Sequence, residues 1–318
     1  MGYRKIIGFG DSSFVISLPK AWVMGNKLKK GDVISVKEEG GYLHISPSFL
    51  KQTQNEKERN IGFDGDLRKL KSEIIHAYID NYNLINITGK NLFDHLNDIK
   101  FLLENVVALE IIQKSPEKIV IKDFLNVQDI SVYDTIRRVD RIVLSMAEDI
   151  RKFFSGKNIN ALEILEQKEK DVNRLTNLIF KTLKKSFNPN DREILKLDFE
   201  DIFYYWEMTL FIEKIADQLK LLPKHIKSPV HQDCVDIFNV AMQQYMNAMK
   251  SNFTKNYDIA INVLTQKKIV YNNAEKLVDK LPHGKDYSSV LEKIKNINDY
   301  SGNISKSLLR LKLESTKD

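Results

Sequence analysis

The sequence is poor in cysteine, with Cys234 alone among 318 residues. A single thiol excludes an intramolecular disulfide framework and any metal site built only from cysteines. Long apolar runs are also missing, since no stretch approaches the roughly 18 consecutive apolar residues that span a bilayer. The opening residues, Met-Gly-Tyr-Arg-Lys, lack the apolar segment of a signal peptide. We therefore expect a cytoplasmic protein that is not inserted in a membrane.

The common signatures of catalysis are absent as well. The six histidines show neither His-Glu-x-x-His nor His/Cys ligand spacing. There is no Gly-x-Ser-x-Gly elbow, no Walker phosphate loop and no dinucleotide fingerprint, so we do not expect an enzyme. A net charge of +6 and a pI of about 9.0 permit an anionic partner, but the placement of the charge must decide whether there is one.

Glycine is concentrated at the beginning of the chain. Seven of the 13 glycines lie in the first 50 residues, a density typical of short strands and tight turns. The pattern predicts strands over residues 4–9, 14–18, 32–37 and 42–46, with one helical turn from Pro19 through Trp22. A segment of this size buries too little apolar surface to be stable alone, so we expect it to dimerise.

The same segment carries a family resemblance. A Gly-Asp-Ser-Ser turn, Leu18-Pro19-Lys20 and Leu28-Lys29-Lys30-Gly31-Asp32 stand in an order similar to the SpoVT/AbrB swapped-hairpin family. The resemblance implies an interleaved homodimer that binds double-stranded DNA. Lysine and arginine outnumber acids by seven to four here, which suits phosphate contacts. The candidate DNA-binding residues are Arg4, Lys5, Ser12, Ser13, Lys20, Lys27, Lys29 and Lys30. The alternative is that residues 1–50 only dimerise.

A polar linker, residues 51–58, separates this segment from a second small unit. Residues 59–128 alternate strand and helix patterns, with strands near 59–63, 84–88, 108–113 and 118–122 and helices over 67–78 and 92–106. The alternation predicts one sheet packed against two helices. We interpret the unit as a spacer or a dimerisation platform, with a small-ligand site as the alternative.

Helical periodicity dominates the rest of the chain, residues 129–318. Apolar residues repeat at steps of three and four, and the pattern predicts two tandem three-helix bundles, over 129–224 and 230–315. The third helix of the first bundle begins at Phe199 and should end at Pro223. The predicted fold is therefore multidomain α+β, with a helical six-helix rear part.

Two carboxylates on that third helix, Glu213 and Asp217, fall in line with its apolar residues. Like charges one turn apart repel, and their burial is costly without a compensating cation. That cation could be a metal. Alternatively, the two acids could be exposed to solvent, or paired with lysine or arginine from the next helix.

The run Ile212-Glu213-Lys214-Ile215-Ala216-Asp217 resembles the acidic motif of the PhoU family, whose members regulate phosphate uptake. The resemblance implies a divalent or iron metal ion in the first bundle, and Glu169, Asn173, Glu213 and Asp217 are its candidate ligands. In the second bundle Lys295 replaces the corresponding glutamate. We therefore expect no metal there and an ion pair between Lys295 and Asp299.

A swapped-hairpin segment joined to a PhoU-like body resembles a fused regulator found in archaea. The sequence thus predicts a DNA-binding, homodimeric regulator of phosphate uptake. One alternative is an adaptor that does not bind DNA and docks on a phosphate transporter or a sensor kinase. Another is a metal-storage bundle, which Lys295 disfavours because it predicts metal in both bundles.

Overall fold

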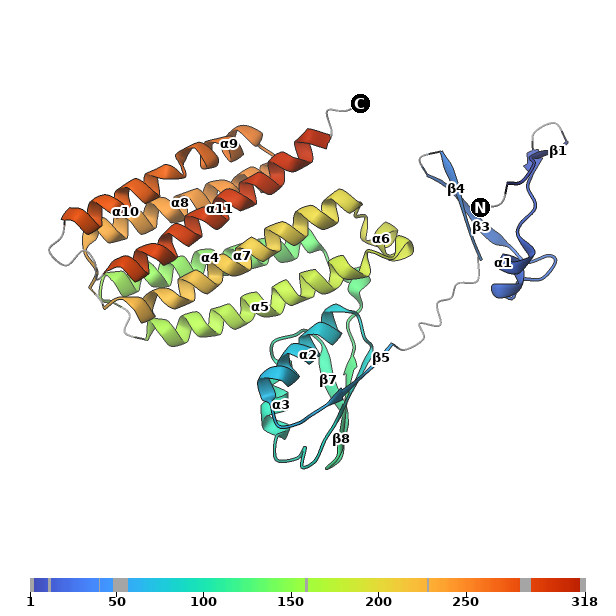
Figure 1. Cartoon of the computed structure of the whole chain (residues 1–318), viewed down its shortest axis with the longest axis horizontal. Helices are drawn as coiled ribbons and strands as arrows, with labels where there is room; N and C mark the ends of the chain where they lie inside the picture. The colour runs from blue at the N-terminus through green and yellow to red at the C-terminus, as the bar shows by residue number, and fades with distance from the viewer. Residues whose placement is uncertain are drawn as a thin grey trace. The chain divides into compact units, whose positions relative to one another are not determined.

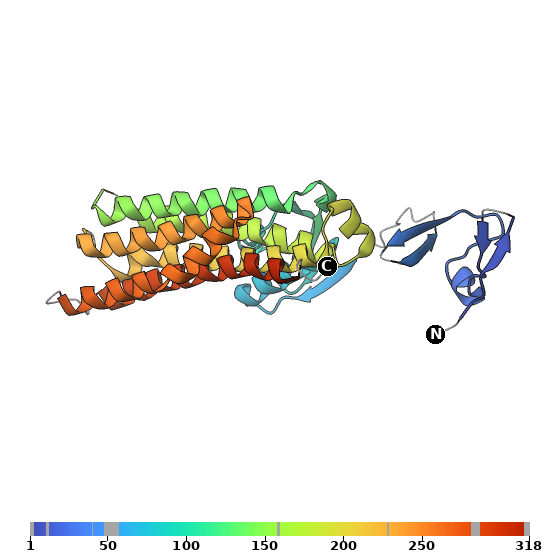
Figure 2. The same cartoon turned by 90° about the horizontal axis from the view of Figure 1, so that it is seen from above.

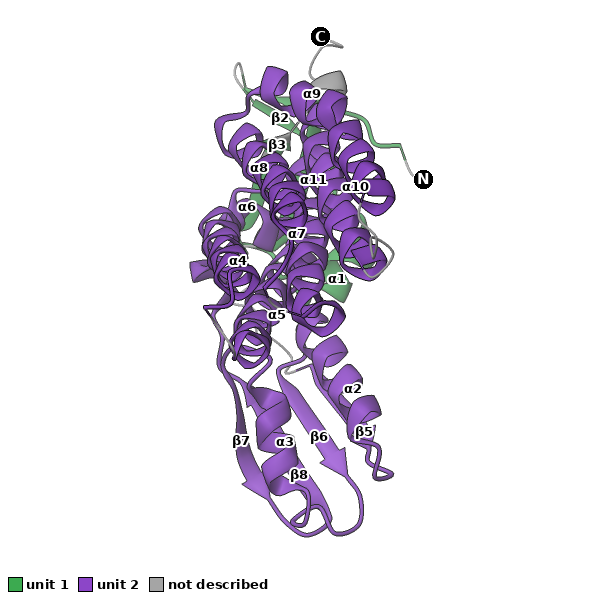
Figure 3. Ribbon diagram, turned by 90° about the vertical axis from the view of Figure 1, so that its left-hand side faces the viewer, with its two compact units in different colours: residues 1–56 green, residues 57–318 purple. Residues whose placement is uncertain are grey.

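The computed structural model describes residues 3–10, 13–39, 41–47, 57–157, 160–227, 229–280 and 287–314. The chain forms two compact units, residues 1–56 (the front unit) and residues 57–318 (the main unit), coloured separately in Figure 3. Ser12 and most of the predicted linker lie outside the described residues. A strand-rich beginning followed by a helical region confirms the multidomain α+β prediction.

In its described residues, the front unit consists of two separate hairpins and one short helix. Strand β1 (Ile7–Phe9) pairs antiparallel with β2 (Ser13–Val15), and β3 (Ile34–Glu39) pairs antiparallel with β4 (Tyr42–Pro47). Helix α1 (Lys20–Gly25) follows Pro19, whose fixed φ suits the residue before a helix. It runs three residues beyond the single turn predicted from the sequence. The first two strands are shorter than predicted.

The first part of the main unit is a four-stranded sheet with two helices. Its strands run in the order β5-β6-β8-β7, with β5 parallel to β6 and the other two pairs antiparallel. Their bounds are Glu58–Gly62 for β5, Leu84–Thr88 for β6, Leu109–Lys114 for β7 and Lys118–Asp123 for β8. Helices α2 (Leu67–Ile79) and α3 (Leu96–Leu103) pack with the sheet around a buried apolar core (Figure 1).

The second helix of this part is shorter than the predicted range of 92–106. The backbone N–H of Leu92 donates to the carbonyl of Pro116, 2.9 Å away, so the chain is held in a turn before α3 begins. Gly89 precedes that turn, and a Cβ there would lie 2.8 Å from the carbonyl oxygen of Phe63. Only glycine fits so close to a neighbouring backbone.

The rest of the main unit is helical. After a short 3₁₀ turn, η1 (Val127–Asp129), come α4 (Val132–Phe154), α5 (Ala161–Lys185), α6 (Pro189–Leu195), α7 (Phe199–His225), α8 (Gln232–Thr254), α9 (Tyr257–Gln266), α10 (Lys268–Lys280) and α11 (Ser288–Glu314). Helices α4, α5 and α7 contact one another, and α11 contacts α8, α9 and α10. The third helices of the two sets, α7 and α11, pack together. The long helices of both sets lie side by side in Figures 1 and 2. One continuous apolar core joins both sets.

The helical region differs from the sequence predictions in three places. Helix α7 continues past Pro223 to His225, because a proline in the last turn removes only one helical hydrogen bond. The apolar periodicity predicts a single helix over 257–281, but the chain there is divided into α9 and α10 at Lys267, whose carbonyl accepts a hydrogen bond from Asn298. Helix α6 was not predicted, although Asn188 caps it through its side chain and Pro189 opens it.

Candidate functional site

Helix α7 carries apolar residues on two of its faces, and most of the first face is buried. Ile212, Ile215 and Leu219 are at most 1% exposed. The second face packs less fully, since Trp206 lies against Phe180 of α5 at a ring-centroid distance of 4.7 Å, while Phe199 is 53% exposed. The acids of α7, Glu213 and Asp217, lie in line with Trp206 on this second face, where α7 meets α5.

All four predicted metal ligands meet at this junction, but a lysine lies among them. The Nζ atom of Lys220, on α7, lies 2.8 Å from Oε1 of Glu169 on α5 and 3.4 Å from Oδ1 of Asp217. The amide of Asn173 donates to the same Oε1 of Glu169 at 2.7 Å. We call Glu169, Asn173, Glu213, Asp217 and Lys220 the acid–lysine cluster. The sequence prediction missed Lys220, whose spacing of three residues from Asp217 was the available signal.

Burial governs the protonation of this cluster. It raises the pKa of Glu213 to about 7, and the negative charges of Asp217 and Glu169 act in the same direction. Burial also raises the pKa of Asp217, although Lys220 opposes the shift. Burial by itself would lower the pKa of Lys220, but the hydrogen bond and charge of Glu169, with those of Asp217, outweigh it, so that pKa is raised. One charged ammonium thus contacts two carboxyl groups, those of Glu169 and Asp217.

The cluster does not fit a metal ion in this arrangement. Within the described ranges, no group of three or more His, Cys, Asp or Glu side chains is arranged to hold one. Oε1 of Glu169 already accepts from two donors, and the ammonium of Lys220 lies at the position where a cation would compensate the acids. Of the arrangements left open by the sequence, pairing with lysine is the one observed, although that lysine belongs to α7 itself.

The second bundle repeats this arrangement with different residues. Lys267, between α9 and α10, lies 3.0 Å from Oδ1 of Asp299 on α11. The hydroxyl of Tyr271 donates to the other oxygen of Asp299 at 2.8 Å. The predicted ion pair between Lys295 and Asp299 was wrong, because the Lys295 ammonium lies over the Tyr271 ring, 5.2 Å from its centroid.

A buried ion pair joins the sheet part to the helical part. The Nζ of Lys181, on α5, lies 2.7 Å from Oδ2 of Asp123 at the end of β8, and the two side chains are 1% and 5% exposed. The same ammonium donates to the carbonyl of Tyr78 at 3.0 Å. The sequence offered no signal for this contact, because a lysine on an apolar face is normally expected at the surface.

The front unit presents its predicted DNA-binding side chains to solvent. Every described member of that set is exposed, namely Arg4, Lys5, Ser13, Lys20, Lys27, Lys29 and Lys30. Ser12 lies outside the described residues. The backbone N–H of Lys29 donates to Asp32 at 2.7 Å, which fixes the turn that carries Lys29 and Lys30.

The front unit also exposes large apolar side chains. None of its residues whose side chains are described is buried. Those that are at least 60% exposed are Tyr3, Ile6, Ile7, Phe9, Phe14, Met24, Val33, Tyr42 and Leu43. A single copy of this unit therefore has no apolar core among the described residues.

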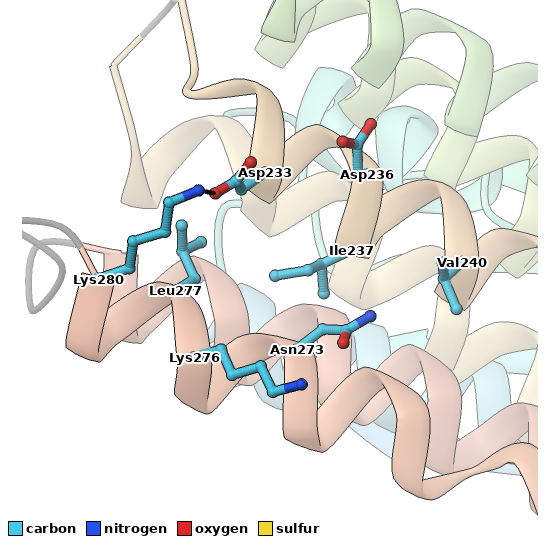
Figure 4. Close-up of a pocket in the computed structure, with 8 residues that line it drawn as sticks. All are labelled: Asp233, Asp236, Ile237, Val240, Asn273, Lys276, Leu277 and Lys280. Carbon is cyan, nitrogen blue, oxygen red and sulfur yellow. Dashed lines mark hydrogen bonds and ion pairs between the residues drawn. The ribbon is translucent and has the colours of Figure 1, made fainter.

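The main unit contains cavities away from the acid–lysine cluster. One, of about 310 Å³ between α8 and α10, is shown in Figure 4. Ile237 and Leu277 line it, and the ion pair of Asp233 with Lys280, 2.7 Å long, lies at one end. Another, of about 370 Å³, lies where the start of α7 meets the end of α11, beside Phe203. Neither brings together a set of catalytic groups.

The structure defines a class of protein, a helical bundle with charged inter-helix clusters and a small basic front unit. The family model of the PhoU domain matches residues 136–221, which cover most of α4, all of α5 and α6, and α7 through Leu221. The match contains the whole acid–lysine cluster, and the first bundle is therefore PhoU-like. No curated protein and no solved structure matches the chain. Among the described residues, no helix has the length and apolarity needed to cross a membrane.

Proposed function

We propose that this protein is a DNA-binding regulator of phosphate homeostasis whose front unit binds the duplex as a homodimer. The observation that carries the proposal is the PhoU domain match over residues 136–221, joined in one chain to an exposed basic unit. Proteins with this domain are regulators or adaptors of phosphate transport rather than enzymes. The helical body would respond to the phosphate state or to a partner protein, and the front unit would act on a promoter.

The exposed apolar side chains of the front unit support its proposed dimerisation. Phe9 is 72% exposed and Phe14 is 78% exposed, on strands that pair with each other. Each fully buried aromatic or aliphatic side chain is worth about 1.5–3 kcal/mol, and a single copy gains little of this. A second copy with the same exposed strands supplies the missing core, as the swapped-hairpin resemblance implies. Large apolar side chains exposed in such numbers are typical of protein interaction surfaces.

The exposed cations of the front unit suit the phosphate backbone. Lys20 begins α1 and Lys27 follows its last residue, Gly25, so the two exposed side chains lie at the two ends of one short helix. Pairing two copies would double the charge within one continuous surface. Lysines that contact phosphates give affinity that is nearly independent of base sequence. This affinity falls steeply as the salt concentration rises, because the release of counterions from the DNA is then less favourable.

Substitution of both lysines by glutamate tests DNA binding. We expect Lys20→Glu with Lys27→Glu to weaken duplex affinity at least about tenfold and to flatten its dependence on salt, because two phosphate contacts are lost. Fluorescence anisotropy with labelled promoter duplexes at several salt concentrations measures both. The matched control is Lys152→Glu with Lys157→Glu, an equal charge change at exposed positions of the main unit. Wild-type affinity that does not change with salt, or equal losses in both double variants, would contradict the proposal.

The PhoU match also supports an adaptor that docks on phosphate transport or signalling proteins without binding DNA. Affinity capture with the full chain distinguishes the two functions. Recovery of transporter or sensor-kinase subunits, with no retention of promoter DNA, favours the adaptor. Retention of promoter DNA that the Lys20 and Lys27 double variant loses favours the regulator.

A further inference from the structure

The acids that a PhoU-like bundle would offer to a metal are contacted by lysines in both halves of the helical region. In the first bundle Lys220 contacts Glu169 and Asp217, and in the second Lys267 contacts Asp299. Asp217 on α7 and Asp299 on α11 each follow an isoleucine pair at the same spacing, Ile212 and Ile215 in one helix and Ile294 and Ile297 in the other. In each bundle a lysine therefore compensates the charge of an aspartate on the third helix, but the two lysines come from different places in the repeat.

The ammonium of Lys220 lies between carboxylates where a bound cation would otherwise lie, and the chain itself supplies this charge. The Lys220 side chain is 21% exposed and Glu169 is 14% exposed, so the ion pair is largely withdrawn from solvent. The ammonium bridges α5 and α7, which is the role a metal with carboxylate ligands on two helices would have. The amide of Asn173 occupies a further direction around the Glu169 carboxylate.

We propose that Lys220 is a resident cation that takes the place of a divalent metal ion in the first bundle, so that this chain holds its PhoU-like helices together without metal. A lysine charge cannot be removed by a chelator or by a change in metal supply. The inference concerns α5 and α7 only and does not depend on DNA binding by the front unit.

Removing the lysine should uncover a metal site. In Lys220→Met the carboxyl groups of Glu169 and Asp217 lose their ammonium, with Glu213 close by, and hard oxygen ligands of this kind suit Mn²⁺. After equilibrium dialysis of the full chain against Mn²⁺, we expect this variant to hold about one ion per chain more than the wild type. Its melting temperature should rise by about 5 °C at a Mn²⁺ concentration about 100-fold above Kd, whereas the wild type should show no shift.

A neighbouring ion pair provides the matched control. Lys224, one turn further along α7, pairs with Glu166 of α5 at 3.0 Å, but both side chains are more than 40% exposed. Lys224→Met removes the same charge from the same pair of helices and should gain no Mn²⁺. If Lys220→Met does not fold, as judged by circular dichroism, Lys220→Gln is measured in the same way.

Two results would overturn the proposal. One is a Mn²⁺ ion in the wild type that Glu169→Gln with Asp217→Asn abolishes, because the acids would then bind metal in spite of Lys220. The other is a folded Lys220 variant that gains no more Mn²⁺ than Lys224→Met. The wild-type comparison needs no Lys220 variant, and none of these results bears on whether the front unit binds DNA.

Discussion

At the scale of single residues, the main unit contains buried or partly buried charged side chains that contact specific partners. Asp140 on α4 accepts a hydrogen bond from the hydroxyl of Tyr245 on α8 at 2.8 Å. Burial raises the pKa of Asp140, while Tyr245 and then Arg137 and Arg141 act against the shift. The negative charge of Asp140 is therefore held in the fold at a cost, because its desolvation is only partly compensated.

Asp140→Asn should stabilise the protein near neutral pH. Asparagine keeps an oxygen that accepts from Tyr245 and removes the desolvated charge. Because the pKa of Asp140 is raised in the folded state, its contribution to stability is fullest below the unfolded pKa near 3.8 and is lost as pH rises through the folded pKa. We expect a gain in melting temperature on the order of 2 °C at about pH 7 that disappears at about pH 3.

Thermal unfolding followed by circular dichroism across this pH range measures the effect. Asp279→Asn, at an exposed position on α10, is the control and should change the melting temperature little at any pH. A loss of stability in Asp140→Asn at neutral pH would show that Arg137 and Arg141 compensate the charge fully.

At the scale of elements, α5 connects the sheet part with the rest of the helical region. One side of α5 carries Glu169 and Asn173 toward α7. Another side contacts the sheet part: the Lys170 ammonium lies 4.3 Å from the Phe101 ring centroid, Asn177 donates to the carbonyl of Asn105 at 3.2 Å, and Lys184 pairs with Asp80. These contacts follow the helical repeat, so α5 holds the sheet part at a fixed place.

Among the contacts between α5 and the sheet part, the buried ion pair of Lys181 with Asp123 should contribute most to stability. Lys181→Met leaves the Asp123 carboxylate buried without its cation, which costs about 3–5 kcal/mol for a buried pair. Lys184→Met removes the largely exposed pair with Asp80 and should cost less than about 1 kcal/mol. Chemical denaturation of the full chain measures both losses.

A second substitution separates charge from packing at this junction. Adding Asp123→Asn to Lys181→Met removes the orphaned charge and should restore part of the stability, because the cost lies mainly in the unpaired carboxylate. Equal losses in the Lys181 and Lys184 variants would contradict a special role for the buried pair.

The elements were predictable from sequence where packing follows local periodicity. Helices α4, α5, α7 and α11 were recognised because large apolar residues recur at helical spacing over more than 20 positions. The start of α3 was not recognised, because it depends on a bond from Leu92 to Pro116, 24 positions further along the chain. Lys220 was missed for a related reason, since its choice of Glu169 as partner depends on how α5 and α7 approach each other.

At the scale of the whole molecule, the two units differ in how they can be stable. The main unit has two apolar cores of its own, one in the sheet part and one in the helical part. The front unit has no buried side chain among its described residues. We expect the main unit to fold from a single chain and the front unit to need a second copy.

A charged residue on the exposed hairpin should therefore disrupt the proposed dimer. We expect Phe14→Asp to weaken self-association and duplex affinity, each by more than about tenfold, because it places a carboxylate in the proposed shared core. Light scattering after size-exclusion chromatography measures the mass, and anisotropy measures DNA binding. The thermal transition of the helical region should not change.

Phe203→Asp is the matched control, since Phe203 is 69% exposed on α7 of the main unit. It should leave both the mass and the DNA affinity as in the wild type. A monomeric wild type that still binds duplex DNA tightly would contradict the proposed role of the front unit, and so would loss of the dimer in Phe203→Asp with Phe14→Asp unaffected.

If the front unit binds DNA as a dimer, as proposed, the absence of a buried side chain among its described residues has a consequence for gene control. When two chains must pair before either front unit is stable, the dimer concentration in a cell with few copies rises with roughly the square of the chain concentration. A modest change in expression would then change promoter occupancy sharply, and DNA binding would be lost soon after division or proteolysis lowers the copy number.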